Sequence, residues 1–173
     1  MVATKADIKR DLRAKLRRQR DARYTEHTLV HLLNLPEFSQ AQVIASYYSY
    51  GSEPNTQELN KAIIDSGKTL LLPRIAGEVL EWVKWDGSKE ALQENGKFHE
   101  PVGDPIKDLS LIDLVLVPAL AIDPDGYRLG QGGGFYDRAL PLMRAWKHGV
   151  VYPFERMEHD LPREAWDVAL DSW

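Results

Sequence analysis

Apolar residues are spaced along this chain in two distinct ways. From Ile8 to Leu16 they recur at every fourth position in a segment without Gly or Pro, which predicts an amphipathic helix over about 4–22. The segments 69–73 and 114–117 are instead short, wholly apolar runs, typical of strands buried on both faces of a sheet. Because such segments alternate along the chain, we expect an α/β fold with a mostly parallel sheet.

The remaining elements follow from residue type and from Gly and Pro as boundaries. We expect helices over 25–33 (with Thr25 as N-cap and Pro36 beyond its end), over 56–66 (stopped by Gly67), and over 135–143 despite Pro141. Further strands are predicted over 43–48, 79–85 and 149–152, and turns at 51–54 and 123–126. Residues 86–112 show no sustained period, so no element is assigned there.

Length and composition narrow the class of protein. The 173 residues are 43% apolar and 28% charged, as expected for a single globular domain over 1–173. The chain has no cysteine, which excludes disulfides, thiolate metal sites and cysteine nucleophiles. No apolar run approaches the roughly 18 residues of a membrane span, and the N-terminus lacks a signal-like apolar core. We therefore expect a cytoplasmic monomer without membrane contact.

Positive charge is concentrated at the N-terminus. Residues 1–23 contain nine Lys and Arg against three Asp, which gives a local charge of +6. Because the net charge of the whole chain is −4, the remaining residues carry −10. Lys9, Arg13 and Arg17 form one stripe on the predicted helix. This stripe is compatible with three roles: a clamp for a polyphosphate, a solvated basic face, or a contact with nucleic acid. The net negative charge argues weakly against a dedicated nucleic-acid binder.

A glycine-rich loop follows the apolar run at 114–120. Four of the five residues at 130–134 are glycine, between Arg128 and Asp137. The loop lacks the Lys-Ser/Thr of a P-loop and the last glycine of a dinucleotide fingerprint. It nevertheless lies between a strand and a helix start, where backbone N–H groups can bind an anion. Arg128 could contact phosphate oxygens, and Asp137 could hold Mg²⁺. The alternative is a connection whose glycines serve only tight turns.

Two further groups of polar residues are candidates for ligand binding. Tyr50, Glu53 and Asn55 follow the strand at 43–48, and ligands in open α/β sheets bind beyond the carboxyl ends of strands. These residues could recognise a heterocycle, or they could simply form the turn. Asp167 lies between apolar residues near the C-terminus and is by itself as consistent with a helix cap or a surface charge.

Taken together, these motifs resemble the 5-formyltetrahydrofolate cyclo-ligase (methenyltetrahydrofolate synthetase) family. The most specific match is the segment 113–138, which resembles the family signature Pro-x-Leu-x-Phe-Asp-x-x-Gly-x-Arg-Leu-Gly-x-Gly-x-Gly-Tyr-Tyr-Asp almost position for position. Lys9-x-x-Leu-Arg13 matches an N-terminal family element, Leu72-Pro-Arg74 a Leu-Pro-Arg element, and Trp166-Asp-Val168 a late Trp-Asp element.

The resemblance implies an ATP- and Mg²⁺-dependent ligase that forms a C–N bond. ATP phosphorylates the formyl oxygen of 5-formyltetrahydrofolate, the neighbouring ring nitrogen attacks, and phosphate leaves to give 5,10-methenyltetrahydrofolate, ADP and phosphate. It also implies a three-layer α/β sandwich resembling the sugar-isomerase and CoA-transferase-like group. The expected partners are the small molecules ATP and 5-formyltetrahydrofolate, without nucleic acid.

The resemblance also assigns residues. Arg128 and Tyr136 are expected to be catalytic, and Asp137 and Asp167 are expected to bind the metal. The implied ATP site comprises Lys9, Arg13, Arg128, Gly130, Gln131, Gly132, Gly133, Gly134 and Tyr136. The implied folate site comprises Tyr50, Glu53, Asn55, Gln131, Gly132, Gly133, Gly134 and Phe135.

The chain departs from the family pattern at two of these positions. Asn55 stands where the family usually has Asp or Glu, so an uncharged amide would face the pterin N–H groups. Phe135 replaces the first tyrosine of the usual pair and lacks its hydroxyl. These changes leave a second function open, that of a paralogue that activates a different substrate with ATP.

Overall fold

The computed structural model describes residues 4–25 and 28–173. Within these ranges no helix combines the length and the apolar character needed to cross a membrane. The helices are α1 Lys5–Ala22, η1 Val30–Asn34, α2 Pro36–Gln40, α3 Gln57–Asp65, η2 Leu109–Leu111, α4 Phe135–Ala139, η3 Leu140–Leu142 and η4 Pro153–Glu155, where η marks a 3-10 helix. The strands are β1 Val43–Ala45, β2 Thr69–Ala76, β3 Val79–Lys84, β4 Leu92–Asn95, β5 Phe98–Pro101, β6 Leu114–Pro118, β7 Ala121–Ile122, β8 Arg128–Leu129 and β9 Trp146–Val150.

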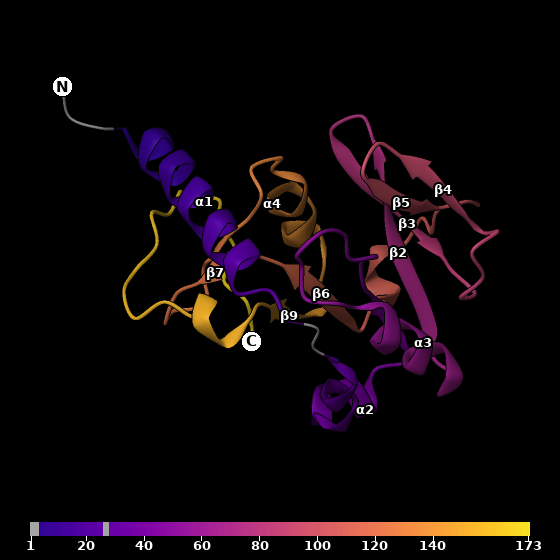
Figure 1. The fold of residues 1–173 in the computed structure, drawn as a ribbon. Coiled ribbons are helices and arrows are strands. Elements are labelled where there is room, and N and C mark those ends of the chain that lie inside the picture. Colours follow the sequence, from indigo (N-terminus) through magenta and orange to yellow (C-terminus); the bar gives the residue numbers. More distant parts are fainter. Residues whose placement is uncertain (1–3, 26–27) are drawn as a thin grey trace.

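A central sheet of five strands organises the fold, in the order β3-β2-β1-β6-β9 (Figure 1). The pairs β1–β2, β1–β6 and β6–β9 are parallel, and only β2–β3 is antiparallel. The predicted α/β fold with a mostly parallel sheet is therefore confirmed.

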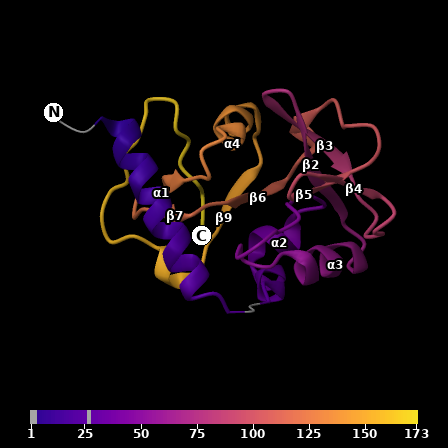
Figure 2. The ribbon, with the colours of Figure 1, turned by 45° about the horizontal axis from the view of Figure 1, so that its top comes forward.

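Both faces of the sheet are buried. Along β6, Leu114 and Leu116 pack into one apolar cluster with residues of η1, α2 and α3, whereas Val115 and Val117 pack into a second cluster with residues of α4 and η3. Figure 2 shows α2 and α3 on one side of β6 and β9 and α4 on the other. The arrangement is consistent with the predicted three-layer sandwich, and it explains why this strand contains only apolar residues.

Helix α1 lies at the opposite end of the molecule from β4 and β5 (Figures 1 and 2). Its N-terminus is closed by a capping box between Thr4 and Asp7. Leu16 packs with Leu120 and Leu129 in a third apolar cluster, as the predicted spacing of apolar residues requires. The predicted helix over 4–22 is thus confirmed, and its packing presents the basic stripe to the rest of the molecule.

The prediction of a helix over 25–33 is wrong for those of its residues that the structure describes. Positions 26 and 27 lie outside the described residues, and only the 3-10 helix η1 follows. Leu35 is extended, with ψ of 141°, because a following proline disfavours the helical conformation. Pro36 itself starts α2, a helix that the sequence analysis did not predict, since proline fits the first turn of a helix.

The strands differ in length from their predictions. β1 ends at Ala45 rather than at residue 48, because the carbonyl of Tyr47 accepts hydrogen bonds from the Thr56 hydroxyl (2.6 Å) and the Asn60 amide (3.0 Å) instead of from a strand. β2 continues through Pro73. At this position β2 pairs only with β3, so the missing N–H of proline breaks no pairing with β1. β9 begins at Trp146, three residues before the predicted 149–152.

The region 86–112, for which no element was predicted, contains the hairpin β4–β5. By contrast, the helix predicted over 135–143 is longer than the observed helix α4. α4 ends at Ala139 and continues as η3, because Pro141 has no N–H to donate to the helix.

Candidate active site

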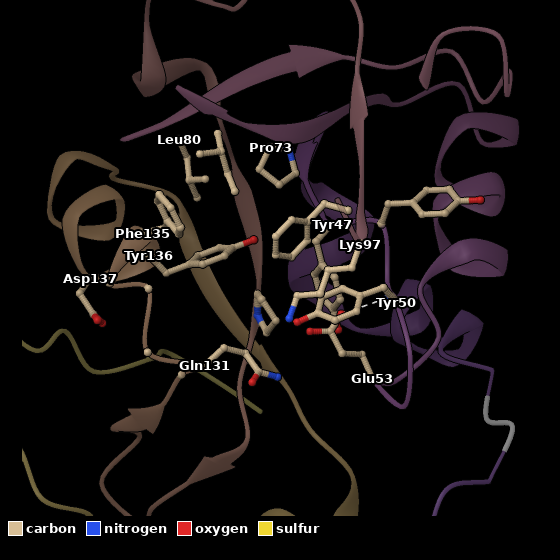
Figure 3. A pocket seen from close by; sticks show the side chains of 18 of the residues that line it. Tyr47, Tyr50, Glu53, Pro73, Leu80, Lys97, Gln131, Phe135, Tyr136 and Asp137 are labelled. Carbon is tan, nitrogen blue, oxygen red and sulfur yellow. Dashed lines mark hydrogen bonds between the residues drawn. The ribbon is translucent and has the colours of Figure 1, made fainter. Parts of the chain in front are cut away.

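A cavity of about 310 Å³ lies beyond the carboxyl end of β6, between α1, the β2–β3 hairpin, β5 and the glycine loop 130–134 (Figure 3). This is the edge of a parallel sheet where ligands are expected. The structure brings most of the predicted site residues to the cavity wall, namely Arg13, Tyr50, Glu53, Arg128, Gly130, Gln131, Gly132, Gly133, Gly134, Phe135, Tyr136 and Asp137. Lys9, Asn55 and Asp167 do not line it.

Helix α1 holds the glycine loop through two arginines. Arg13 donates from Nε to the carbonyl of Gly130 at 2.9 Å. Arg17 donates to both the side-chain oxygen and the backbone carbonyl of Gln131, at 2.9 and 2.7 Å. These contacts use the loop carbonyls. Within the described part of the chain, no N–H group of residues 131–134 donates to another protein atom. The loop therefore retains free donors for an anion.

The glycines of the loop allow side chains to approach the backbone closely, and they also allow tight turns. A Cβ at Gly130 would stand 2.6 Å from a terminal nitrogen of Arg128, so a larger residue there would require the buried guanidinium to shift. Gly134 has a φ of 69° and caps α4, a conformation that favours glycine. The alternative of turn glycines thus accounts for part of the loop, but not for the side-chain approach at Gly130.

The expected contribution of a helix dipole to the loop is smaller than predicted. α4 has only five residues and no side-chain cap, whereas the predicted helix had nine. The partial charge at a helix N-terminus comes from aligned peptide dipoles, so a helix this short provides little of it. An anion at this loop would therefore contact mainly the loop N–H groups and the neighbouring arginines.

Arg128 and Tyr136 form the buried centre of the site. The side chain of Arg128 is 5% exposed, pairs with Asp137 at 2.5 Å, and lies 5.7 Å from the centre of the Tyr136 ring. Burial lowers the pKa of Arg128 and raises that of Tyr136. Among the described residues, Arg128 Nε and the Tyr136 hydroxyl have no hydrogen-bond partner although both are buried. Such groups are costly unless a ligand satisfies them.

Lys9 and Asp167 meet beside this centre. Lys9 Nζ lies 3.3 Å from an Asp167 oxygen, which also accepts the N–H of Glu164 at 2.8 Å. The charge of Asp167 raises the pKa of Arg128 against the stronger effect of burial, so the two side chains are electrostatically coupled. The pair therefore extends the charged part of the site along α1, outside the cavity.

The other half of the cavity is aromatic and contains one buried acid. Figure 3 shows Tyr47, Tyr50 and Lys97 around Glu53, facing Tyr136 and Phe135 across the cavity. Lys97 Nζ lies 4.7 Å from the centre of the Tyr50 ring. Glu53 accepts the N–H of Tyr50 at 3.2 Å. Burial raises the pKa of Glu53 to about 7, in spite of that hydrogen bond and the nearby positive charges.

Asn55 has a local partner away from the cavity. Its side-chain oxygen accepts the N–H of Gln57 at 2.9 Å, at the start of α3. This is the turn chemistry that the sequence analysis left open for the segment. A role for Asn55 in binding a substrate stays a prediction.

The structure adds residues that the site prediction omitted. Arg17 belongs to the predicted basic stripe, but nothing in the sequence around it distinguishes it from the neighbouring cations of the helix. Lys97 and Phe98 come from the β4–β5 hairpin, in a region without a sequence period. Tyr47 lies within the strand predicted over 43–48. In the sequence, that half of the cavity is indicated by Tyr50 and Glu53, which follow the strand predicted over 43–48.

The protonation of Glu53 predicts a dependence of stability on pH. The pKa rises from 4.5 to about 7 on folding, so both states are protonated below pH 4.5 and stability from this group is complete there. As pH rises towards 7 the unfolded state loses its proton first, and stability falls by on the order of 3 kcal/mol. We expect Glu53→Gln to remove this loss between pH 5 and 8, measured by urea unfolding at both values.

The matched control for that experiment is Glu58→Gln, at an exposed position of α3. It should leave the difference between pH 5 and 8 unchanged. If Glu53→Gln has the same pH dependence as the wild type, Glu53 does not titrate in this range.

The fold and the site together define an α/β protein with one cavity beyond the carboxyl end of its sheet, in which a cationic, glycine-lined half adjoins an aromatic half. A family model described as the 5-formyltetrahydrofolate cyclo-ligase family matches residues 2–172. The chain belongs to this family. The family resemblance drawn from the sequence motifs is therefore confirmed.

Individual relatives agree with this assignment. The chain is 30% identical over 158 residues to 5-formyltetrahydrofolate cyclo-ligase of Escherichia coli K12, covering 85% of each chain. It is 31% identical over 172 residues to the Haemophilus influenzae protein of the same name, covering 93% of this chain and 90% of that one. The solved structure of Aquifex aeolicus 5,10-methenyltetrahydrofolate synthetase superposes with a TM-score of 0.80 at 32% identity, over 95% of this chain and 87% of that one.

Proposed function

We propose that this protein is an ATP-dependent 5-formyltetrahydrofolate cyclo-ligase that produces 5,10-methenyltetrahydrofolate, ADP and phosphate. The observation that carries the proposal is the pair of unsatisfied buried groups, Arg128 Nε and the Tyr136 hydroxyl, at the junction of the two halves of the cavity. The reaction transfers the terminal phosphoryl group of ATP to the formyl oxygen of the folate, and this junction lies between the expected sites of both substrates.

The cationic half is assigned to the triphosphate. Phosphoryl transfer depends mainly on positioning and on neutralising the charge that develops on the phosphate oxygens. Arg13, Arg128 and the free N–H groups of the loop provide both functions. Arg17, from the same helix, fixes the loop through Gln131. Lys9 extends the same stripe by one helical turn.

Asp137 and Asp167 are assigned to Mg²⁺. Mg²⁺ is commonly held by one or two carboxylates together with phosphate oxygens and water. Asp137 lines the cavity, and both acids act electrostatically on Arg128, so two carboxylates are available beside the proposed phosphate site. In the described ranges there is no group of three or more acidic or histidine side chains that could hold a metal ion. Bound there, the metal would neutralise charge on the phosphate oxygens.

The aromatic half is assigned to the folate. Tyr50, Phe135 and Glu53 line it, and a flat pterin can stack on aromatic rings while its N–H groups reach a buried carboxylate. Because Glu53 has a pKa of about 7, it can accept hydrogen bonds as the anion or donate one as the acid near neutral pH. The pterin N–H groups favour the anion.

At the junction, two residues act on the reacting oxygen. Arg128 would stabilise negative charge on the phosphoryl group as it moves from ATP to the formyl oxygen. Burial raises the pKa of Tyr136, so its hydroxyl stays protonated and donates a hydrogen bond. No covalent enzyme intermediate is needed, because the phosphate on the formyl oxygen is itself the leaving group when the ring nitrogen attacks.

Binding experiments separate this function from its alternatives. We expect ATP with Mg²⁺ and 5-formyltetrahydrofolate each to raise the melting temperature when added separately. A rise in melting temperature with ATP and Mg²⁺ but not with 5-formyltetrahydrofolate would favour a paralogue that activates another substrate. A shift with neither would contradict the proposal. The nucleic-acid alternative predicts strongly salt-dependent affinity for RNA or DNA, and it does not account for the glycine loop or for Asp137.

A further inference from the structure

The β4–β5 hairpin forms one wall of the aromatic half of the cavity. Phe98 begins β5 and Lys97 lies in the turn before it, and both line the cavity. The Phe98 ring lies edge-on to the Tyr50 ring with their centres 5.1 Å apart, and the centre of the His99 ring lies 5.2 Å from that of Tyr48. On this side the hairpin therefore adjoins the segment that follows β1.

On its other side the hairpin packs against β2 (Figure 1). β1 pairs with β2 up to Leu71. Further along β2, Ile75 donates its N–H to a carboxylate oxygen of Glu100, a residue of β5, at 2.9 Å. Because β4 and β5 form a two-stranded sheet of their own, side-chain contacts of this kind attach the hairpin to the central sheet.

Glu100 binds a donor with each of its two oxygens. The second oxygen accepts the side-chain amide of Asn95 at 3.1 Å, and Asn95 lies opposite Phe98 in the register of the hairpin. Glu100 is 4% exposed and lines the cavity wall, as Ile75 does. A buried carboxylate is costly unless it is hydrogen-bonded, and its removal would leave both donors without this acceptor. One buried side chain thus joins the end of the hairpin to β2.

We propose that Glu100 is a positioning residue for the folate, because it holds the β4–β5 hairpin on β2 so that Phe98 and Lys97 form the cavity wall. The inference rests on the proposed function, which assigns the aromatic half of the cavity to the folate. Glu100 acts through the hairpin in this account, and its effect is on the binding of the folate and not on phosphoryl transfer.

Steady-state kinetics with 5-formyltetrahydrofolate and ATP varied separately tests this role. We expect Glu100→Ala to raise the KM for 5-formyltetrahydrofolate about tenfold, because the aromatic wall is no longer held against the ligand. The kcat and the KM for ATP should stay unchanged. The hairpin lies at the opposite end of the molecule from α1, and a loss of binding that the ground state and the transition state share leaves kcat as it was.

Two further variants show whether Glu100 acts through the hairpin. Glu100→Gln keeps an oxygen for the Ile75 N–H, and the Asn95 amide can turn to accept from the new amide, so this variant should retain most of the wild-type affinity. Phe98→Ala should by itself raise the KM for the folate. The double variant Glu100→Ala/Phe98→Ala should be no worse than the more impaired single variant, because both changes remove the same wall.

The control is Glu94→Ala. Glu94 is an exposed glutamate on β4 of the same hairpin, and it does not line the cavity. This substitution should leave kcat and both KM values unchanged.

An unchanged KM for the folate in Glu100→Ala overturns the inference and leaves the proposed function intact. Unfolding of Glu100→Ala, or an equal rise of both KM values, also overturns it, because Glu100 would then support the whole fold. Independent effects of Glu100→Ala and Phe98→Ala would show that Glu100 does not act through the hairpin. A wild-type protein that forms no methenyl product overturns the inference and the proposed function together.

Discussion

Arg128→Ala is expected to lower kcat on the order of 10²-fold or more, the effect typical of removing a preorganised group that stabilises developing charge. The side chain is held in place by burial and by Asp137, so its charge is already positioned when the substrates bind. In the proposed mechanism Arg128 acts on the transferring phosphoryl group, so kcat should fall more than the KM for folate rises. Steady-state kinetics with both substrates varied measures the two effects separately.

Arg144→Ala is the matched control, because Arg144 is an exposed arginine that does not line the cavity. It should have wild-type kinetics. A wild-type kcat in Arg128→Ala would remove Arg128 from the mechanism.

Glu155→Leu is expected to destabilise the fold by about 3–5 kcal/mol, the usual effect of leaving a buried charge without its partner. Arg20 and Glu155 are 3% and 1% exposed, and the guanidinium donates to both carboxylate oxygens at 2.6 and 2.7 Å. Arg20 also donates to the carbonyl of Ala119, just after β6. The pair therefore attaches α1, which carries the basic stripe of Lys9, Arg13 and Arg17, to the end of β6 in the central sheet.

The double variant Arg20→Met/Glu155→Leu separates the lost charge from lost packing. It removes both charges and should recover most of the free energy of unfolding, as measured by urea denaturation. Asp65→Ala, which breaks an exposed ion pair with Lys61, should cost less than about 1 kcal/mol. A loss for Glu155→Leu as small as that of Asp65→Ala would show that the buried pair does not hold α1.

Local patterns allowed much of the cationic half to be predicted. The spacing of apolar residues places α1, and the same spacing puts Lys9, Arg13 and Arg17 on one stripe. The glycines, Arg128 and Asp137 lie within ten residues of one another, so their proximity follows from the chain itself. The pairing of Lys9 with Asp167 spans most of the sequence, and only the family resemblance indicated it.

The aromatic half depends on contacts that the sequence pattern does not contain. Lys97 and Phe98 reach the cavity because the β4–β5 hairpin packs beside β2, and short, mostly exposed strands leave no strong period. The errors at Pro36 and Pro141 have a common cause. Proline ends one helical segment but can begin the next, so its position alone does not tell which role it has.

The most direct test of the account is turnover of 5-formyltetrahydrofolate by the purified protein with ATP and Mg²⁺. Formation of 5,10-methenyltetrahydrofolate is followed by its absorbance, and ADP is measured in the same samples. The account predicts one ADP for each methenyl product, with no product when ATP is omitted. Binding of ATP without formation of the methenyl product would contradict it.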